Sequence, residues 1–92
     1  MPYRLEHAPE RGRYELLDES GVVAFASIEE RGRDTVIYHT EVDRSRRGQG
    51  TGGELVARVL QNLRERDRRA VPACSFVRRF MVEHPDYSDV LA

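Results

Sequence analysis

The spacing of apolar residues changes about halfway along the chain. Up to residue 42, apolar and polar residues largely alternate in short runs, and turn-forming residues separate these runs. Such alternation is typical of β-strands, so we expect strands at residues 3–7, 13–17, 22–28 and 35–42. The last run is the strongest candidate because β-branched and aromatic residues fill it. Strands that follow one another this closely favour an antiparallel meander.

The run at 35–42 also predicts which side chains share a face. Successive residues of a strand point to opposite sides of a sheet, so every second side chain lies on the same side. One face is therefore expected to carry Ile37, His39 and Glu41, and the other to carry Val36, Tyr38, Thr40 and Val42.

After a turn at residues 43–50, the apolar spacing becomes that of an α-helix. Thr51 is followed three residues later by Glu54, which fits a capping box, so the helix is expected to begin at Thr51 or Gly52. The residues that share one apolar stripe of this helix are Leu55, Val56, Val59, Leu60 and Leu63.

The last third of the chain adds one strand and one helix. Residues 70–73 form a short apolar run that contains Pro72, which indicates a short or edge strand. Ser75 is expected to cap a second helix, and this helix should end near His84 because Pro85 follows. The order is therefore βββ(β)-α-β-α, which predicts an α+β fold with a mixed or antiparallel sheet of about five strands and two helices.

Length and composition restrict the kind of protein. The 92 residues leave room for one domain, over residues 1–92, with one modest core. Hydrophobic residues make up 39% and charged residues 34%, a balance typical of a folded chain. No apolar stretch approaches the roughly 20 residues that cross a bilayer, and the first residues lack an apolar signal core. We therefore expect a cytoplasmic protein without a membrane partner. The single cysteine, Cys74, excludes an internal disulfide and agrees with a reducing compartment.

Charge is distributed unevenly along the chain, although the formal net charge is only −1. Residues 1–43 contain five Arg and ten acidic residues, whereas residues 44–69 contain eight Arg and three acidic residues. The acidic first half argues against nucleic acid as a partner. A solvated helix face accounts for most of the arginines at 58–69. It does not account for Arg44, Arg46 and Arg47, which directly precede a cluster of glycines.

This cluster has the composition of an anion-binding turn. Glycines let backbone N–H groups turn toward a ligand, and the start of the following helix adds unpaired N–H donors and partial positive charge. Such a turn suits a pyrophosphate, and the arginines before it suit a further phosphate. A P-loop is excluded because the chain has no Lys, and no early βαβ unit supports a dinucleotide fingerprint. The alternative is a tight strand-to-helix turn without a ligand.

The segment Arg47-Gly48-Gln49-Gly50-Thr51-Gly52 resembles the acetyl-CoA motif of GNAT acyltransferases, Arg/Gln-x-x-Gly-x-Gly/Ala. Residues 38–42, 71–77 and 84–87 also resemble the small single-domain GNAT-like family that includes the N-acetyltransferase domain-containing proteins. The resemblance implies that backbone groups of Glu41 and Val42 align the pantetheine arm and that N–H groups of residues 47–52 hold the pyrophosphate. The cofactor-binding residues expected for acetyl-CoA or CoA are then Glu41, Val42, Arg46, Arg47, Gly48, Gln49, Gly50, Thr51 and Gly52.

His39 and Glu41 are the candidate bases. Two residues apart on one strand, their side chains start about 6.6 to 7 Å apart on the same face. Either could take a proton from an acceptor amine, and an imidazole is better suited because it titrates close to neutral pH. The structural alternatives are a core histidine with satisfied hydrogen bonds and a solvated glutamate.

Cys74 is the candidate nucleophile. It stands between a short strand and a helix N-terminus, a setting that lowers the pKa of a thiol, although a single cysteine is often just a small buried residue. The resemblance implies that strands 35–42 and 70–73 are neighbours, which would let His39 and Cys74 both face the thioester. A Cys74 thiolate activated by His39 could then accept the acetyl group, while direct transfer to the amine stays open. No His/Cys pair has zinc spacing, so no metal is expected.

The expected function is therefore that of a small acetyl-CoA-dependent N-acetyltransferase. Larger GNAT enzymes carry further helices and strands that build the acceptor site, and a chain of 92 residues has no room for them. The acceptor amine and the oligomeric state are accordingly not indicated. The alternative is a CoA-binding module without turnover that acts with a partner protein.

Overall fold

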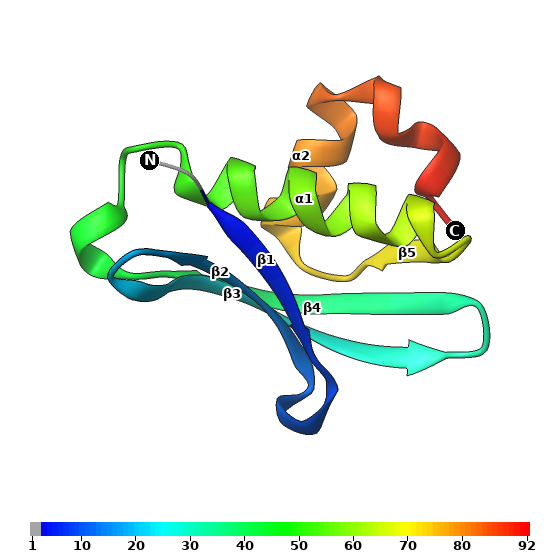
Figure 1. Cartoon of the computed structure of the whole chain (residues 1–92). Coiled ribbons are helices and arrows are strands. Elements are labelled where there is room, and N and C mark those ends of the chain that lie inside the picture. The colour runs from blue at the N-terminus through cyan, green and yellow to red at the C-terminus, as the bar shows by residue number, and fades with distance from the viewer. Residues whose placement is uncertain (1–2) are drawn as a thin grey trace.

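A five-stranded sheet carries both α-helices on one of its faces (Figure 1). The computed structural model describes residues 3–92. The elements in chain order are β1 (Arg4–Ala8), β2 (Arg13–Asp18), β3 (Gly21–Arg31), β4 (Asp34–Val42), α1 (Thr51–Glu65), β5 (Arg69–Pro72) and α2 (Ser75–Glu83). Short 3-10 helices occupy Pro9–Arg11, Arg44–Arg46 and Pro85–Val90. The α+β class, the element order and the mixed sheet expected from the sequence are confirmed.

The strands lie in the sheet in the order in which they occur in the chain. Strands β1 to β4 form an antiparallel meander, and β5 pairs with β4 in parallel. Parallel neighbours need a long crossover connection, which the 15 residues of α1 supply here. The parallel ladder is short, since it comprises four residue pairs between residues 34–37 and 69–72.

Strand β4 contains a bulge in its middle. Ser27 of β3 pairs with His39, whereas the next residue, Ile28, pairs with Ile37. Tyr38 is therefore an extra residue without an opposite partner, and an extra residue reverses the alternation of side chains that follow it. Before the bulge the odd-numbered residues of β4 consequently face the helices, and after it the even-numbered residues do.

The bulge corrects the expected faces of this strand. Ile37 is 1% exposed and lies in the core under the helices. Beyond the bulge, Thr40 and Val42 point to this same side, where they approach Cys74 and α1. His39 and Glu41 point to the opposite, open side of the sheet and are exposed. The prediction that Ile37 shares a face with His39 and Glu41 was wrong because it assumed an uninterrupted strand.

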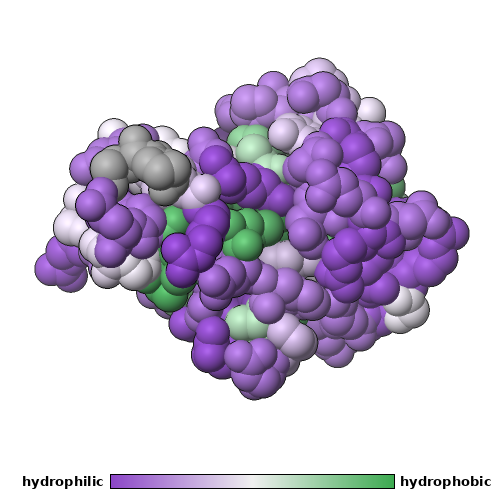
Figure 2. Space-filling view, viewed as in Figure 1, coloured by the Kyte–Doolittle hydropathy of each residue, from purple (hydrophilic) through white to green (hydrophobic). Residues whose placement is uncertain are grey.

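The core lies between the sheet and the two helices. All five residues of the expected apolar stripe of α1 are buried against apolar residues of β2, β3 and β4. Tyr14 is fully buried among them, and its hydroxyl donates a hydrogen bond to Asn62 Oδ1 at 2.7 Å. The molecular surface seen from the side of β1 is largely hydrophilic, with a small apolar area near its centre (Figure 2). No helix within residues 3–92 is long and apolar enough to span a membrane.

Helix α1 begins at Thr51 as expected, but not through a capping box. Gly50 occupies the N-cap position, and no side chain caps the helix. The Thr51 hydroxyl donates to the backbone oxygen of Arg46 at 3.4 Å, and Glu54 instead accepts a hydrogen bond from Arg58 one turn further on. The predicted capping box was therefore wrong, and the start of the helix is left without a bound carboxylate.

Helix α2 begins one position from where a Ser75 cap would place it. Cys74 is the N-cap residue, and Ser75 is the first helical residue and makes no capping hydrogen bond. The helix ends at Glu83 before His84, as the following proline predicted, and the His84 ring stacks on Phe80 with centroids 4.0 Å apart. The shift by one residue puts the thiol, rather than a hydroxyl, at the helix start.

Candidate cofactor and catalytic site

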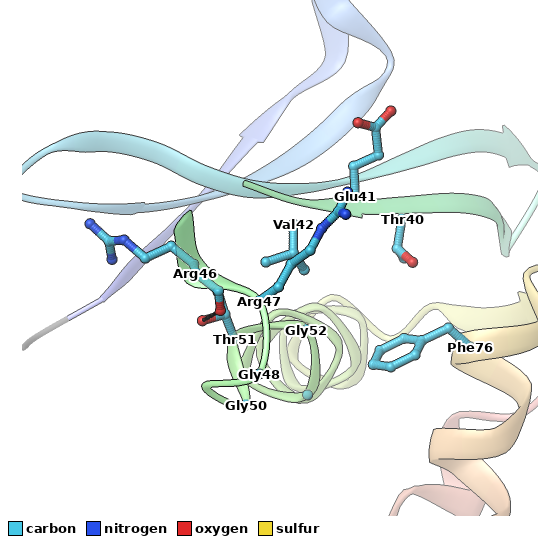
Figure 3. Close-up of a pocket in the computed structure, with 11 residues that line it drawn as sticks. Thr40, Glu41, Val42, Arg46, Arg47, Gly48, Gly50, Thr51, Gly52 and Phe76 are labelled. Carbon is cyan, nitrogen blue, oxygen red and sulfur yellow. Dashed lines mark hydrogen bonds between the residues drawn. The ribbon is translucent and has the colours of Figure 1, made fainter. Parts of the chain in front are cut away.

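A cleft of about 430 Å³ opens between the end of β4, the glycine-rich turn and the start of α2 (Figure 3). Its size is within the range of small-molecule sites. The residues that line it are Thr40, Glu41, Val42, Arg46, Arg47, Gly48, Gly50, Thr51, Gly52, Gly53 and Phe76. The expected cofactor-binding residues thus gather around one cleft, apart from Gln49, whose side-chain amide donates to Ser45 O at 3.3 Å.

The turn owes its shape to two glycines. Gly48 and Gly50 have φ angles of 80° and 77°, in the left-handed region that other residues enter only with strain. No atom lies within 4 Å of the place a Cβ would take at either residue, so the space beside the turn is open. The first intrahelical bond of α1 runs from Glu54 N to Gly50 O, which leaves the preceding N–H groups free for a ligand. An anion such as a pyrophosphate fits this arrangement.

Gly52 has a different role, because it lets an aromatic ring touch the helix. A Cβ at Gly52 would lie 2.9 Å from Cζ of Phe76, closer than such atoms approach in proteins. Phe76 therefore packs on the backbone of α1, and its ring forms the wall of the cleft opposite Arg47 (Figure 3). The sequence analysis did not identify Phe76 as a site residue. The signal available in the sequence was Gly52 inside the expected helix, because a glycine there can indicate that another group packs closely against the backbone.

The three arginines before the turn differ in what they contact. The Arg46 guanidinium pairs with the buried carboxylate of Asp18 and donates to Ser20 Oγ at 2.9 Å, and it points away from the cleft (Figure 3). The hydrogen bonds from Arg46 and Ser20 lower the pKa of Asp18 to about 2. Within residues 3–92, Arg44 and Arg47 have no ion-pair partner, and Arg47 extends along the edge of β4 toward Glu41.

Strands β4 and β5 separate at the inner end of the cleft. Their pairing stops at Ile37 and Pro72, and the backbone N–H of Cys74 then donates to the oxygen of Ile37 at 3.0 Å. Beyond this point the chain turns into α2, so the edge of β4 from residue 38 to 42 has no neighbouring strand on this side within the described residues. This free edge can offer backbone groups to an extended ligand in the cleft.

Cys74 is partly buried and lies behind Thr40, next to the cleft but not among the residues that line it. Its sulfur is 3.6 Å from the hydroxyl oxygen of Thr40, which lines the cleft. Burial raises the pKa of this thiol, but hydrogen bonds from the backbone N–H of Val77, the Thr40 hydroxyl and the N–H of Phe76 outweigh burial, and the pKa of Cys74 falls below its ordinary value. The surroundings thus favour the thiolate.

The structure brings two of the three expected catalytic residues together and gives the third other neighbours. His39 Nε2 lies 3.0 Å from Glu41 Oε2 on the open face of the sheet. Cys74 instead contacts Thr40 on the face that the helices cover. The expected activation of Cys74 by His39 therefore finds no contact in the described residues, because the bulge turns His39 to the other side of β4.

Comparison with known proteins identifies the family. The sequence profile described as GCN5-related N-acetyl-transferase matches residues 13–90. The chain belongs to this family. Members of this family use CoA thioesters as acetyl donors, and by family the chain is an acetyltransferase. Comparison with curated proteins gave no significant relative.

Solved structures share the fold of this GCN5-related chain. A GCN5-like protein from Staphylococcus aureus has a TM-score of 0.73 at 23% identity, over 97% of this chain and 87% of that one. The ribosomal-protein-S18-alanine N-acetyltransferase of Escherichia coli has a TM-score of 0.60 at 20% identity, over 77% and 48%. Ard1 from Thermoplasma volcanium has a TM-score of 0.57 at 20% identity, over 79% and 54%. The chain thus matches about half the length of the last two proteins.

Proposed function

We propose that the chain is an acetyl-CoA-dependent N-acetyltransferase that binds the donor in the cleft between the glycine-rich turn and Phe76. One observation carries this proposal. A single cleft connects a turn with free N–H donors to Thr40, whose hydroxyl contacts the thiol at the start of α2. A long ligand with an anion at one end and a reactive group at the other suits this cleft.

Each wall of the cleft binds a different part of the donor. The N–H groups of residues 48–52 hold the pyrophosphate, since that of Arg47 donates to Arg44 O, and the Arg47 guanidinium pairs with a phosphate oxygen. Backbone groups of Glu41 and Val42 align the pantetheine arm along the free edge of β4. Arg46 acts through the turn, since its guanidinium is held by Asp18 while its backbone oxygen accepts from Thr51. Gln49 contributes its main chain.

The chemical part uses Cys74 and the His39–Glu41 pair in separate steps. Bound acetyl-CoA supplies an activated acyl group. The Cys74 thiolate attacks the acyl carbon, a bond forms to Sγ, and the CoA sulfur leaves and takes a proton from solvent. An acceptor amine then attacks the acetyl group on Cys74 and frees the thiolate again. The His39–Glu41 pair, on the open face of the sheet, takes a proton from the ammonium form of the acceptor before the amine passes the free edge of β4.

Mass spectrometry of the purified chain with acetyl-CoA tests this proposal. Native spectra should contain a CoA complex, and denatured spectra should retain one acetyl group on Cys74, which Cys74→Ala should lack. If no complex forms, the cofactor assignment is refuted. If the acetyl adduct is absent and Cys74→Ala still transfers acetyl groups, direct attack by the amine with His39 or Glu41 as base replaces the Cys74 route. A complex without any transfer would favour the non-catalytic CoA-binding module.

A further inference from the structure

A second hollow, of about 310 Å³, lies beside the cofactor cleft and shares Glu41, Val42 and Arg47 with it. It also reaches Arg13 and Phe25, whose side chains lie on the open face of the sheet. Phe25 pairs directly with Glu41 across β3 and β4, which places both on that face. The two cavities therefore meet at the edge of β4 but extend to different sides of it.

The charges around this hollow are unequal. Three arginines and two carboxylates line it, namely Arg13, Arg44, Arg47, Glu41 and Asp43. Both carboxylates have hydrogen-bond partners. Asp43 accepts from the N–H and the hydroxyl of Ser45, and Glu41 lies within hydrogen-bond distance of the His39 imidazole. The guanidinium of Arg44 has no hydrogen-bond or ion-pair partner among residues 3–92. The hollow thus contains the Arg44 cation, unpaired among the described residues, and the carboxylate of Glu41, which contacts His39 just outside the hollow.

The ring of Phe25 joins these two regions. Its centroid is 6.1 Å from that of the His39 ring, and the Arg13 guanidinium stacks 4.1 Å above its centre. The ring gives the hollow an apolar wall between a proton acceptor and a cationic region. A ligand that follows this wall needs a basic group at one end, an anionic group at the other and carbon atoms between them.

Given the proposed acetyltransferase function, we propose that this hollow binds the acceptor, and that the acceptor is a small molecule with an anionic group several carbon atoms from its amine. The amine lies at the His39–Glu41 pair, where it can lose its proton and reach the cofactor cleft across β4. A carboxylate or phosphate at the other end binds Arg44. Arg13 is paired with Glu15 and contributes to the wall through its stacking on Phe25. A volume of about 310 Å³ suits a small metabolite.

NMR titration of the CoA-saturated protein tests the proposal without needing turnover. The probes are γ-aminobutyrate and butylamine, which differ in the anionic end, and phosphoethanolamine and ethanolamine, which form a second such pair. Each probe with an anionic group should bind about tenfold more tightly than its counterpart without one, as expected for one charge-assisted hydrogen bond at an exposed site, and should shift the amide signals of Phe25, Glu41 and Arg44. A stronger response to phosphoethanolamine would identify phosphate as the anion, and one to γ-aminobutyrate a carboxylate.

Two variants make the test specific. Arg44→Ala should reduce the affinity for the probes with an anionic group to that of the probes without one. Arg31→Ala removes an equally exposed arginine at the far end of β3, where it pairs with Glu29, and should leave the affinities unchanged. Equal binding of probes with and without the anionic group, tighter binding of the polycation spermidine, or no binding of any probe would overturn the proposal.

Titrating the CoA-saturated protein distinguishes a failure of the acceptor assignment from a failure of the proposed function on which it rests. CoA binding is followed independently through the amide signals of residues 48–52. If CoA does not bind, the proposed function fails, and the same titration of the free protein still decides whether the hollow selects anionic amines. If the anionic probes bind the free protein but CoA displaces them, phosphates of CoA fill the hollow and the acceptor assignment is wrong.

Discussion

Replacing Arg47 by alanine should weaken CoA binding about tenfold and leave the melting temperature almost unchanged. A hydrogen bond to a charged group contributes about 1.5–3 kcal/mol. Arg47 is exposed, so solvent screens its contact with phosphate and the lower value applies, which corresponds to roughly one order of magnitude in Kd. Stability should change little because Arg47 has no ion-pair partner within residues 3–92.

Arg46→Ala provides the matched contrast one residue away. This substitution leaves the buried Asp18 carboxylate without the guanidinium that neutralises it, and an uncompensated buried charge is strongly destabilising. The melting temperature should therefore fall clearly in Arg46→Ala and not in Arg47→Ala. CoA affinity should fall in both variants, directly for Arg47 and through a loosened turn for Arg46.

Calorimetric titration with CoA and thermal denaturation of both variants measure these effects. The Arg47 contribution should shrink as salt is raised, because exposed charges are screened over about 10 Å at 0.1 M ionic strength. Unchanged CoA affinity together with a large loss of stability in Arg47→Ala would show that this residue supports the fold. The phosphate assignment would then be wrong.

Three further experiments address the turn, the thiol and the buried carboxylate. Gly50→Asp and Gly50→Asn impose similar backbone strain at a φ of 77°, but only Asp adds an anion, so calorimetry should detect CoA binding to Asn and almost none to Asp. Cys74 should react with iodoacetamide with an apparent pKa below the ordinary thiol value of about 8.5, and CoA should slow the reaction. The His39→Ala substitution should leave the rate unchanged, since His39 and Cys74 lie on different faces of β4. The ionised Asp18 carboxylate stabilises the fold above its unfolded pKa of 3.8, and this stability is lost as the pH falls toward about 2. Asp18→Asn should therefore be less stable than the parent at neutral pH, and unfolding curves in acid should no longer show the difference.

The fold was largely predictable because its signals are local. Alternation, turn residues and the change to helical spacing all act over a few positions, and they gave each strand and both helix starts to within a few residues. The bulge at Tyr38 is different, since it is defined by how β4 pairs with β3 and no residue within β4 marks it. The capping box of α1 was wrong for a related reason, because Glu54 has a competing partner in Arg58. The cap of α2 was displaced by one residue, from Ser75 to Cys74.

The candidate site was predictable only where it is continuous in sequence. The glycine-rich turn could be read directly, since Gly48 and Gly50 have the conformations that glycine serves. The pairing of Asp18 with Arg46 joins residues 28 positions apart, and the sequence could not distinguish Arg46 from Arg47. Phe76 reaches the cleft by the packing of α2 on α1, which depends on tertiary structure alone.

The short parallel ladder between β4 and β5 has a consequence for the order in which the molecule folds and opens. The meander of β1 to β4 is built from neighbours in the chain, whereas β5 joins only after the long α1 connection and through four residue pairs. Contacts of this non-local kind form late and open first. Opening of this seam would carry away Cys74 and Phe76 together, since both follow β5 directly. A ligand that spans the seam stabilises the closed state by mass action, so amides of β5 and α2 should gain the most protection from hydrogen exchange when CoA binds.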